Sequence, residues 1–491
     1  MKNWINKTFI LILSVGIVTS CSDSYVDVPP EYSIDSENYF NVEDDYNQAL
    51  IAAYDLLQTT YLNAMLGEIA SDNTLCGGES ATDVPGFQQI DDMIHTSNND
   101  NLQDLWNWMF SGVQRAAYVI EFKDKTEFSG KESLIAEAYF LRAYYNFELV
   151  KWFGPIPIKA NGRFVVGDEQ KIVRSSKEEV YALIEEDLLT AIENLPLTAS
   201  QAGRATLGAA QSLLGKAYLY QGMFDEAAAM LDNVIESGQY EMVANYDEIF
   251  EHVGENGTGS VFEVQYTDAE GAGFDCFQCS EGNIAVGFNG IRQYVGPTFD
   301  SGFSFNVPTQ ELVDEYETGD KRKDVAILDI EAWASRFGAS YGTGYEHTGY
   351  FNRKYIARKG DSNIGDQNLT NPNNYRAIRY ADVLLMAAEA NSKKTSPDET
   401  KARLYLNIVR ERAFGNTSNA VNASGNALQE AINHERRVEL AGEGHRFFDL
   451  VRTGKAAQEI EGFTLNKNEL FPLPLEEIQF ANGNWEQNPG Y

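Results

Sequence analysis

The chain has 491 residues, of which 43% are hydrophobic and 23% charged, so it can bury a large core. Its formal net charge of −35 at pH 7 repels nucleic acid and anionic lipid headgroups, which excludes both as expected ligands. The length fits two or three domains, or one large helical domain with insertions.

The first twenty residues have the pattern of a secretory signal. Two lysines precede the apolar run FILILSVGIV, which is too short to span a membrane comfortably. The sequence VTSC then places two small residues before Cys21, which resembles a bacterial lipoprotein cleavage box. We therefore expect residues 1–20 to be a lipoprotein signal peptide and Cys21 to carry lipid. The alternative is an ordinary secretory signal with a chance cysteine.

Residues 21–40 are polar and contain proline, so we expect a tether between the lipid and the folded body. Beyond them, apolar residues recur at spacings of three and four, which predicts amphipathic helices. The helices are expected in 41–60, 101–122, 131–154, 176–195, 205–237, 380–394, 399–414, 427–442 and 445–455.

Two of these stretches carry more specific signals. Ser176 is a plausible N-cap, with Glu179 as its partner in a capping box. In 205–237, the residues from Leu214 to Tyr218 fit the L-G-x-x-Y part of the tetratricopeptide pattern. Gly215 would then let two helices approach closely. The tryptophan and proline positions of that pattern are not met, so the repeat is degenerate.

The middle of the chain has a different composition. Residues 261–350 contain fifteen aromatic residues and twelve glycines, with few helical periods, which is typical of loops and short strands. Cys276 and Cys279 form a C-x-x-C motif there. A zinc site would need a second pair, so we expect loop cysteines or one local disulfide.

The stretch HERRVELAGEGHRFFDLVRTGK, residues 434–455, concentrates charge. It is not a zinc-protease motif, because Val438 stands where H-E-x-x-H needs its second histidine. The charges alternate around a glycine-containing bend, so we expect an ion-pair network that fixes how helices dock. An acid/base site is the alternative. The expected network residues are His434, Glu435, Arg436, Glu439, Gly444, His445, Arg446, Asp449 and Arg452.

Several motifs in order resemble those of the SusD/RagB family of outer-membrane lipoproteins. After the signal come AEAYFLRAYYNFELVKWFGPIPI, GRATLGAAQSLLGKAYLY, NYRAIRYADVLLMAAEA and HERRVELAGEGHRFFDLVR, and the chain ends LFPLPLEEIQFANGNWEQNPGY. The resemblance covers nearly the whole chain and is weak around 70–100 and 255–370. The pair GHRFFDLVR and the C-terminal segment is its strongest part.

The resemblance implies a mostly α fold of about four tetratricopeptide-like helical pairs, with irregular loop and short-strand insertions. One domain would occupy 41–491, with helical parts at 41–254 and 371–491 and a loop-rich insertion at 255–370. It also implies a lipid anchor in the outer membrane, facing the cell exterior. The partner would be a SusC-like TonB-dependent transporter, and the ligand an oligosaccharide or polysaccharide, without catalysis or cofactor.

The binding residues are sought among the aromatic residues of the insertion, because a flat ring matches the apolar face of a sugar. Trp333 is the first candidate, since the other tryptophans lie in the signal, on apparent helix stripes or in the tail. Local packing is its alternative role. The further candidates are Tyr341, Tyr294 and Phe288, with Asp72 and Asn73 as polar partners.

Three other functions remain open. A peptide-binding member of the same architecture would hold an extended chain, including a basic one. A tetratricopeptide scaffold would bind proteins and no small ligand. No G-x-S-x-G, P-loop or Rossmann motif supports an enzyme, although a carboxylate pair is compatible with so acidic a sequence. The acids in DAEGAGFD lack the spacing of a calcium loop, so no metal is expected.

Overall fold

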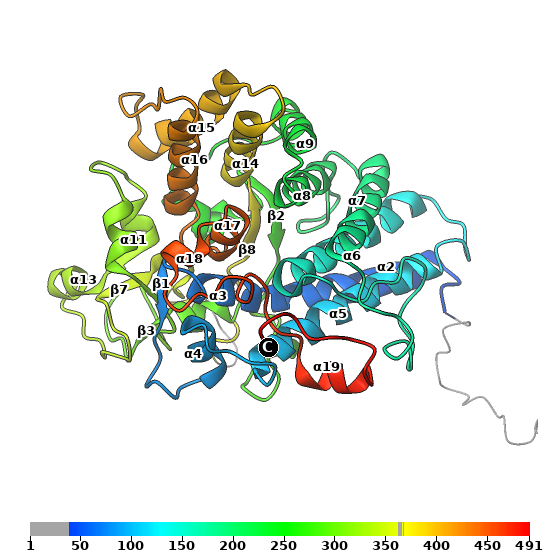
Figure 1. Cartoon of the computed structure of the whole chain (residues 1–491). Helices are drawn as coiled ribbons and strands as arrows, with labels where there is room; N and C mark the ends of the chain where they lie inside the picture. The colour runs from blue at the N-terminus through cyan, green and yellow to red at the C-terminus, as the bar shows by residue number, and fades with distance from the viewer. Residues whose placement is uncertain (1–38, 362–365, 367) are drawn as a thin grey trace, which may run out of the picture.

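The computed structural model describes residues 39–361, 366 and 368–491 (Figure 1). The signal peptide, Cys21 and all but the end of the expected tether lie outside the described residues. Among the described helices, none is both long and apolar enough to cross a membrane.

The long helices pack as consecutive pairs (Figure 1). These pairs are α2 (Glu43–Asp55) with α5 (Asp100–Glu121), α6 (Lys131–Phe153) with α7 (Lys177–Asn194), α8 (Leu207–Tyr220) with α9 (Phe224–Glu236), and α14 (Tyr380–Lys393) with α15 (Glu399–Phe414). In addition, α9 packs against α14, which joins the two helical parts across the insertion. The mostly helical fold class with tetratricopeptide-like pairs is thereby confirmed.

Local sequence signals explain where these helices begin and how closely they pack. Ser176 Oγ accepts from the Glu179 amide at 3.2 Å, and the Glu179 carboxylate accepts from the Ser176 amide at 2.8 Å, so the capping box is present. A Cβ built on Gly215 would lie 2.6 Å from Leu231 Cγ. The glycine is therefore required for the close approach of α8 and α9.

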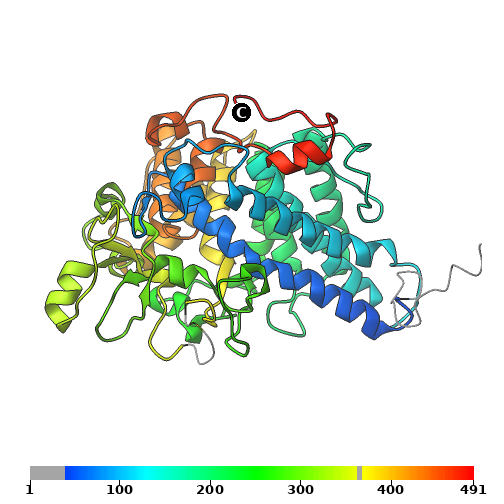
Figure 2. The same cartoon turned by 90° about the horizontal axis from the view of Figure 1, so that it is seen from below.

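Shorter helices connect and cover the pairs. They are η3 (Leu56–Thr60), α3 (Tyr61–Ile69), α4 (Pro85–Asp91), η4 (Asp247–Phe250), η5 (His252–Gly254), α16 (Asn426–Glu439), α17 (Arg446–Arg452), α18 (Ala456–Glu459) and α19 (Leu475–Phe480). Figure 2 shows α19 beside the C-terminus, on the side of the helical layer opposite the insertion.

The insertion contains more helix than the sequence predicts. Its helices are η6 (Phe277–Cys279), α10 (Ala285–Asn289), α11 (Gln310–Glu315), α12 (Lys323–Ala326), α13 (Ile330–Phe337) and η7 (Arg353–Tyr355). These helices are short, and α11, α13 and η7 each have a side-chain cap, as where the Asp329 carboxylate accepts from the Ala332 amide at 2.9 Å. Periodicity over three to eight residues is too brief to identify them from sequence.

The strands in the described residues form two-stranded ladders. The antiparallel ladders pair β1 (Thr74–Cys76) with β5 (Asn306–Pro308), β2 (Ser260–Val264) with β8 (Tyr375–Arg379), and β6 (Ile327–Asp329) with β7 (Tyr350–Asn352). A parallel ladder pairs β3 (Ile291–Arg292) with β4 (Ser301–Gly302). The short strands expected in the insertion are thus present, and they tie it to the segments before and after it.

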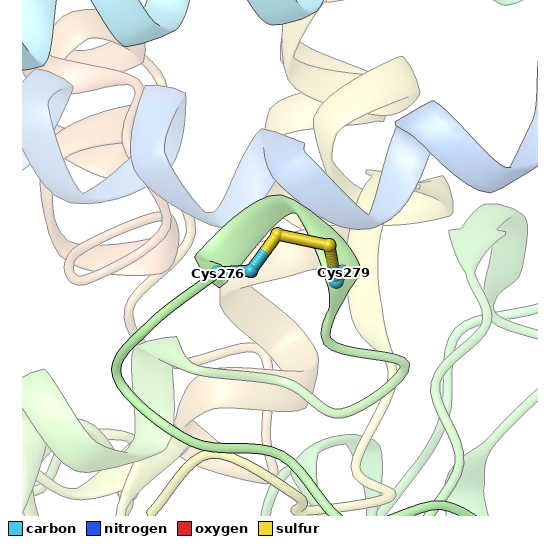
Figure 3. Close-up of a disulfide and its surroundings, with 2 residues drawn as sticks. All are labelled: Cys276 and Cys279. Carbon is cyan, nitrogen blue, oxygen red and sulfur yellow. A yellow bond between two sulfur atoms is a disulfide. The ribbon is translucent and has the colours of Figure 1, made fainter.

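The largest core cluster draws residues from both helical parts and from the start of the insertion. A smaller cluster lies inside the insertion and includes Ile291, Phe299, Ile330 and Phe351. Cys276 and Cys279 form a local disulfide across one turn, one of the two expected alternatives (Figure 3). The insertion therefore has internal packing of its own, which holds its surface side chains in place.

Candidate functional site

The charge cluster of 434–455 forms a buried ion-pair network, as its spacing predicts. Glu439 is fully buried and accepts from three guanidinium groups. They belong to Arg412 at 2.6 Å, Arg379 at 2.9 Å and Arg322 at 2.9 Å. Burial alone would raise the pKa of Glu439, but these three charges hold it well below its usual range. Both oxygens of this carboxylate are engaged in ion pairs, so neither is available to a substrate.

A second branch of the network joins α16, α17 and α14. Arg436 lies 2.7 Å from Asp382 and 3.0 Å from Asp449, while Arg452 lies 2.7 Å from both Asp449 and Glu389. These side chains are largely buried, so each charge depends on its partners for solvation. The branch fixes how three helices dock.

The two histidines of the cluster contact other groups of the protein. His434 Nε2 lies 3.0 Å from the Glu315 carbonyl oxygen. His445 is buried, and this burial, together with the charge of Lys216, lowers its pKa to about 3. A histidine with so low a pKa is poorly matched to acid/base catalysis near neutral pH. These contacts favour the docking role over the acid/base alternative.

Asp72 and Asn73 belong to the same network and not to a ligand surface. Arg446 donates to both Asp72 carboxylate oxygens at 2.8 Å, and Arg437 lies 2.9 Å from Asp72. Arg437 Nε also donates to Asn73 Oδ1 at 2.9 Å, and Asn73 is fully buried. Both side chains are thus already paired within the protein, so the expectation that they supply polar ligand contacts stays a prediction that these contacts disfavour. Sequence could not reveal it, because the arginines lie more than 360 residues away.

The ring of Phe288 lies in the core, which disfavours the predicted ligand contact. It is 7% exposed and packs in the largest core cluster with Phe87 and Phe305 at centroid distances of 5.2 and 5.6 Å. A ring enclosed in this way offers no free face to a sugar. It stands in α10, whereas the sequence predicted a loop.

Trp333 and Tyr294 are brought together. The Trp333 indole N–H donates to Tyr294 Oη at 2.8 Å, and Tyr294 in turn donates to the Pro297 carbonyl at 2.7 Å. Tyr294 is 6% exposed, so it is buried beneath the surface and holds the tryptophan through this hydrogen bond. Trp333 is half-buried and lines a cavity of about 430 Å³ together with Tyr350 and Arg336. Its ring face, and not its N–H, is the group available to a ligand.

Residues 330–347, here called the aromatic segment, hold Trp333 and Tyr341 on one stretch of backbone. The segment is pinned at three places. Ser340 exchanges backbone hydrogen bonds with Val295, Gly342 N donates to Arg292 O at 2.8 Å, and Tyr345 N donates to Gly78 O at 2.9 Å. Tyr341 is half-buried and packs against the same small cluster as Trp333. The side chains are thus presented by a fixed backbone.

The structure adds aromatic candidates that sequence reasoning did not single out. Phe337 and Tyr345 lie in the aromatic segment and are 41% and 36% exposed, and Phe274, beside the disulfide, is 59% exposed. Exposed rings on one segment, as Phe337 and Tyr345 are, are typical of binding surfaces. Aromatic residues are equally frequent in the buried part of the insertion, so composition could not separate the two sets.

No group of three or more His, Cys, Asp or Glu side chains in the described residues is arranged to hold a metal ion. The polar side chains near the aromatic segment are mostly paired with each other. Arg292, for example, donates to the Phe303 carbonyl at 2.8 Å and lies 3.5 Å from Asp83. The surface is therefore suited to contacts through ring faces.

Two family models match the chain. Residues 329–491 match the model described as the SusD family, and residues 24–219 match the model described as "Starch-binding associating with outer membrane". A curated relative, SusD-like protein P38 of Formosa agariphila, is 28% identical over 99% of both chains.

Solved structures agree with these matches. A laminarin binding SusD-like protein is 35% identical, with a TM-score of 0.82 over 92% of this chain and 100% of that one. Surface glycan-binding protein A from Bacteroides thetaiotaomicron, solved in complex with laminarihexaose, is 26% identical, with a TM-score of 0.80 over 91% of this chain and 99% of that one. The sequence and structural similarity together show that this chain belongs to the SusD family.

Proposed function

We propose that the chain is a glycan-binding protein that captures oligosaccharide or polysaccharide through its aromatic segment. The observation that carries the proposal is the 35% identity to a laminarin binding SusD-like protein across 92% of the chain. Laminarin and its hexaose are accordingly the first ligands to test. The strongly negative charge also favours a neutral glycan over an anionic one.

The chemistry of the aromatic segment supports this proposal. Trp333 and Tyr341 are half-buried and pack against the same small cluster, and the Trp333 ring lies 4.9 Å from the ring of Phe299 and 4.3 Å from that of Phe337, so each keeps part of its ring at the surface. Such a ring covers the apolar C–H face of a sugar at a small cost in side-chain entropy. Because Tyr294 already accepts the indole N–H, the expected contact of Trp333 is stacking, while sugar hydroxyls bond to water or backbone groups.

The cellular setting is part of the same proposal. Cys21 would carry the lipid that holds the protein on the outer membrane, facing the cell exterior, with residues 22–40 as the tether. A SusC-like TonB-dependent transporter would receive the glycan, with this protein as the lid that closes over it. No chemical step is assigned to the protein, which would bind its ligand and pass it on unchanged.

The test is affinity electrophoresis of the purified chain in gels that contain laminarin. The double variant Trp333→Ala/Tyr341→Ala should weaken retention by roughly tenfold or more, since each lost ring contact is worth about 1 kcal/mol. Phe224→Ala is the control, because Phe224 is also half-buried but lies on α9, away from the insertion. Retention should persist at high salt, because ring stacking is not screened.

Two results would contradict this proposal. One is absence of retention of the unaltered chain on any neutral glycan, combined with salt-sensitive binding of a basic peptide, which would favour the peptide-binding alternative. The other is retention that the double variant and the Phe224 control leave equally unchanged, which would remove the aromatic segment from the binding site.

A further inference from the structure

A well-formed cavity lies far from the aromatic segment. It has a volume of about 540 Å³, a size typical of ligand pockets, and lies between α5, the loop 155–173 and the C-terminal stretch that contains α19. In both views α19 and α13 lie at opposite sides of the molecule (Figures 1 and 2). This cavity, here called the α5–α19 pocket, is not explained by the site described above.

Aromatic rings from three separate segments line the pocket. Trp106 of α5 and Trp485 near the C-terminus are 3% and 6% exposed and form its floor. Phe110 of α5 and Phe164 of the loop are half-buried, with centroids 6.2 Å apart in an edge-to-face arrangement, and form a wall. A floor and wall of this kind can cover the apolar face of a ring-shaped ligand.

The pocket is held open by its own hydrogen bonds. Gln114 of α5 donates to the Phe164 carbonyl at 2.6 Å and accepts from the Phe164 amide at 2.7 Å. Trp485 and Asn484 both donate to the Ile172 carbonyl at 2.8 Å. These bonds fix both sides of the loop, so the cavity is formed before any ligand binds, which lowers the entropic cost of binding.

Polar groups at the pocket favour a neutral ligand over an anion. Asn107 is an exposed amide, and Glu477 is a carboxylate at the pocket wall whose pKa is raised by burial and lowered in part by hydrogen bonding from Trp106. Asp168 and Glu169 add further negative charge, while Arg115, also in the lining, is paired with Asp55 at 2.6 Å. Beside Phe164, Val165 and Val166 are 56% and 100% exposed, an apolar rim that a ligand would cover.

We infer that the α5–α19 pocket is a second glycan-binding site, which takes a neutral sugar unit of the same polymer that the aromatic segment binds. The inference rests on the proposed glycan-binding function. Two sites on opposite sides of one protein would hold a long chain more tightly than either site alone, through effective concentration. A short oligosaccharide would instead occupy the two sites independently.

The test is calorimetric titration of the full mature chain with laminarihexaose, which should bind about two molecules per protein. Ser111→Trp should fill the pocket and reduce the stoichiometry to about one, because Ser111 lines the cavity and bonds only within its own helix in the contacts described. Phe164→Ala, which removes the wall, is the second variant and should weaken one of the two binding events by about tenfold.

Trp333→Ala/Tyr341→Ala should remove the other binding event and leave the pocket occupied. If Ser111→Trp and Phe164→Ala both leave stoichiometry and affinity unchanged, the pocket inference is wrong while the proposed function stands. If the double variant changes nothing and Ser111→Trp abolishes binding, the pocket is the sole site. Absence of any binding overturns both.

Discussion

Glu439 shows how single charges determine this fold. Its carboxylate is fully buried and contacts three arginines that come from three different parts of the chain. Glu435, one helical turn earlier, is equally buried and pairs with Arg322 at 2.6 Å and Arg410 at 2.7 Å. Removing one carboxylate would leave several buried guanidinium groups without sufficient compensation, which is far more costly than losing a surface pair.

Glu439→Gln should therefore lower the free energy of unfolding by about 3–5 kcal/mol, measured by urea denaturation. Glu430→Gln is the matched control, because Glu430 lies on the same helix but is 63% exposed and pairs only with Lys455 in the contacts described. Its effect should stay within about 0.5 kcal/mol. Equal effects of the two substitutions would contradict the role assigned to the buried network.

At the scale of elements, the contact between α3 and the bend at Gly444 joins the N-terminal and C-terminal parts. Glu68 is 1% exposed at the end of α3, and its carboxylate accepts from the Gly444 amide at 2.7 Å. Gly444 has φ +83°, and a Cβ there would lie 2.6 Å from Ala64 Cα, so the bend packs directly on the helix backbone. Burial raises the pKa of Glu68 to about 7.

This raised pKa predicts a pH dependence of stability. The folded state holds the Glu68 proton up to about pH 7, whereas the unfolded chain releases it near 4.5, so the stabilising contribution present below about pH 4.5 is lost as pH rises to about 7. Glu68→Gln should remove this loss. We expect its free energy of unfolding, relative to the unaltered chain, to rise by on the order of 1–3 kcal/mol between pH 4.5 and pH 8. A difference that does not vary with pH would refute the assignment.

The long helices were predictable from sequence because apolar periodicity over thirteen or more residues is a local signal, as in α9 (13 residues) and α6 (23 residues). Sequence could not predict which side chains of the insertion and its neighbours are buried or paired within the protein. Phe288 packs against Phe87 and Phe305, which come from other segments. Asp72 accepts a hydrogen bond from Arg446, which lies near the other end of the chain. Such contacts depend on the tertiary fold, so residue type alone could not separate them from ligand contacts.

At the scale of the whole molecule, the helical pairs pack into one body with the insertion on one side (Figure 2). The α5–α19 pocket is lined by residues of α5, the loop 155–173 and the C-terminal stretch. The aromatic segment is pinned by backbone hydrogen bonds at Val295, Arg292 and Gly78, so its rings are positioned independently of ligand. The proposed function depends on this arrangement. A fixed surface binds a stiff glycan without the cost of ordering a loop.

The most direct test of the central claim is a crystal structure of the mature chain with laminarihexaose. We predict sugar rings stacked on the exposed parts of Trp333 and Tyr341, with the Trp333 indole N–H still donating to Tyr294. A structure in which the hexaose is bound but no sugar contacts residues 330–347 would contradict the claim that the aromatic segment is the primary glycan site.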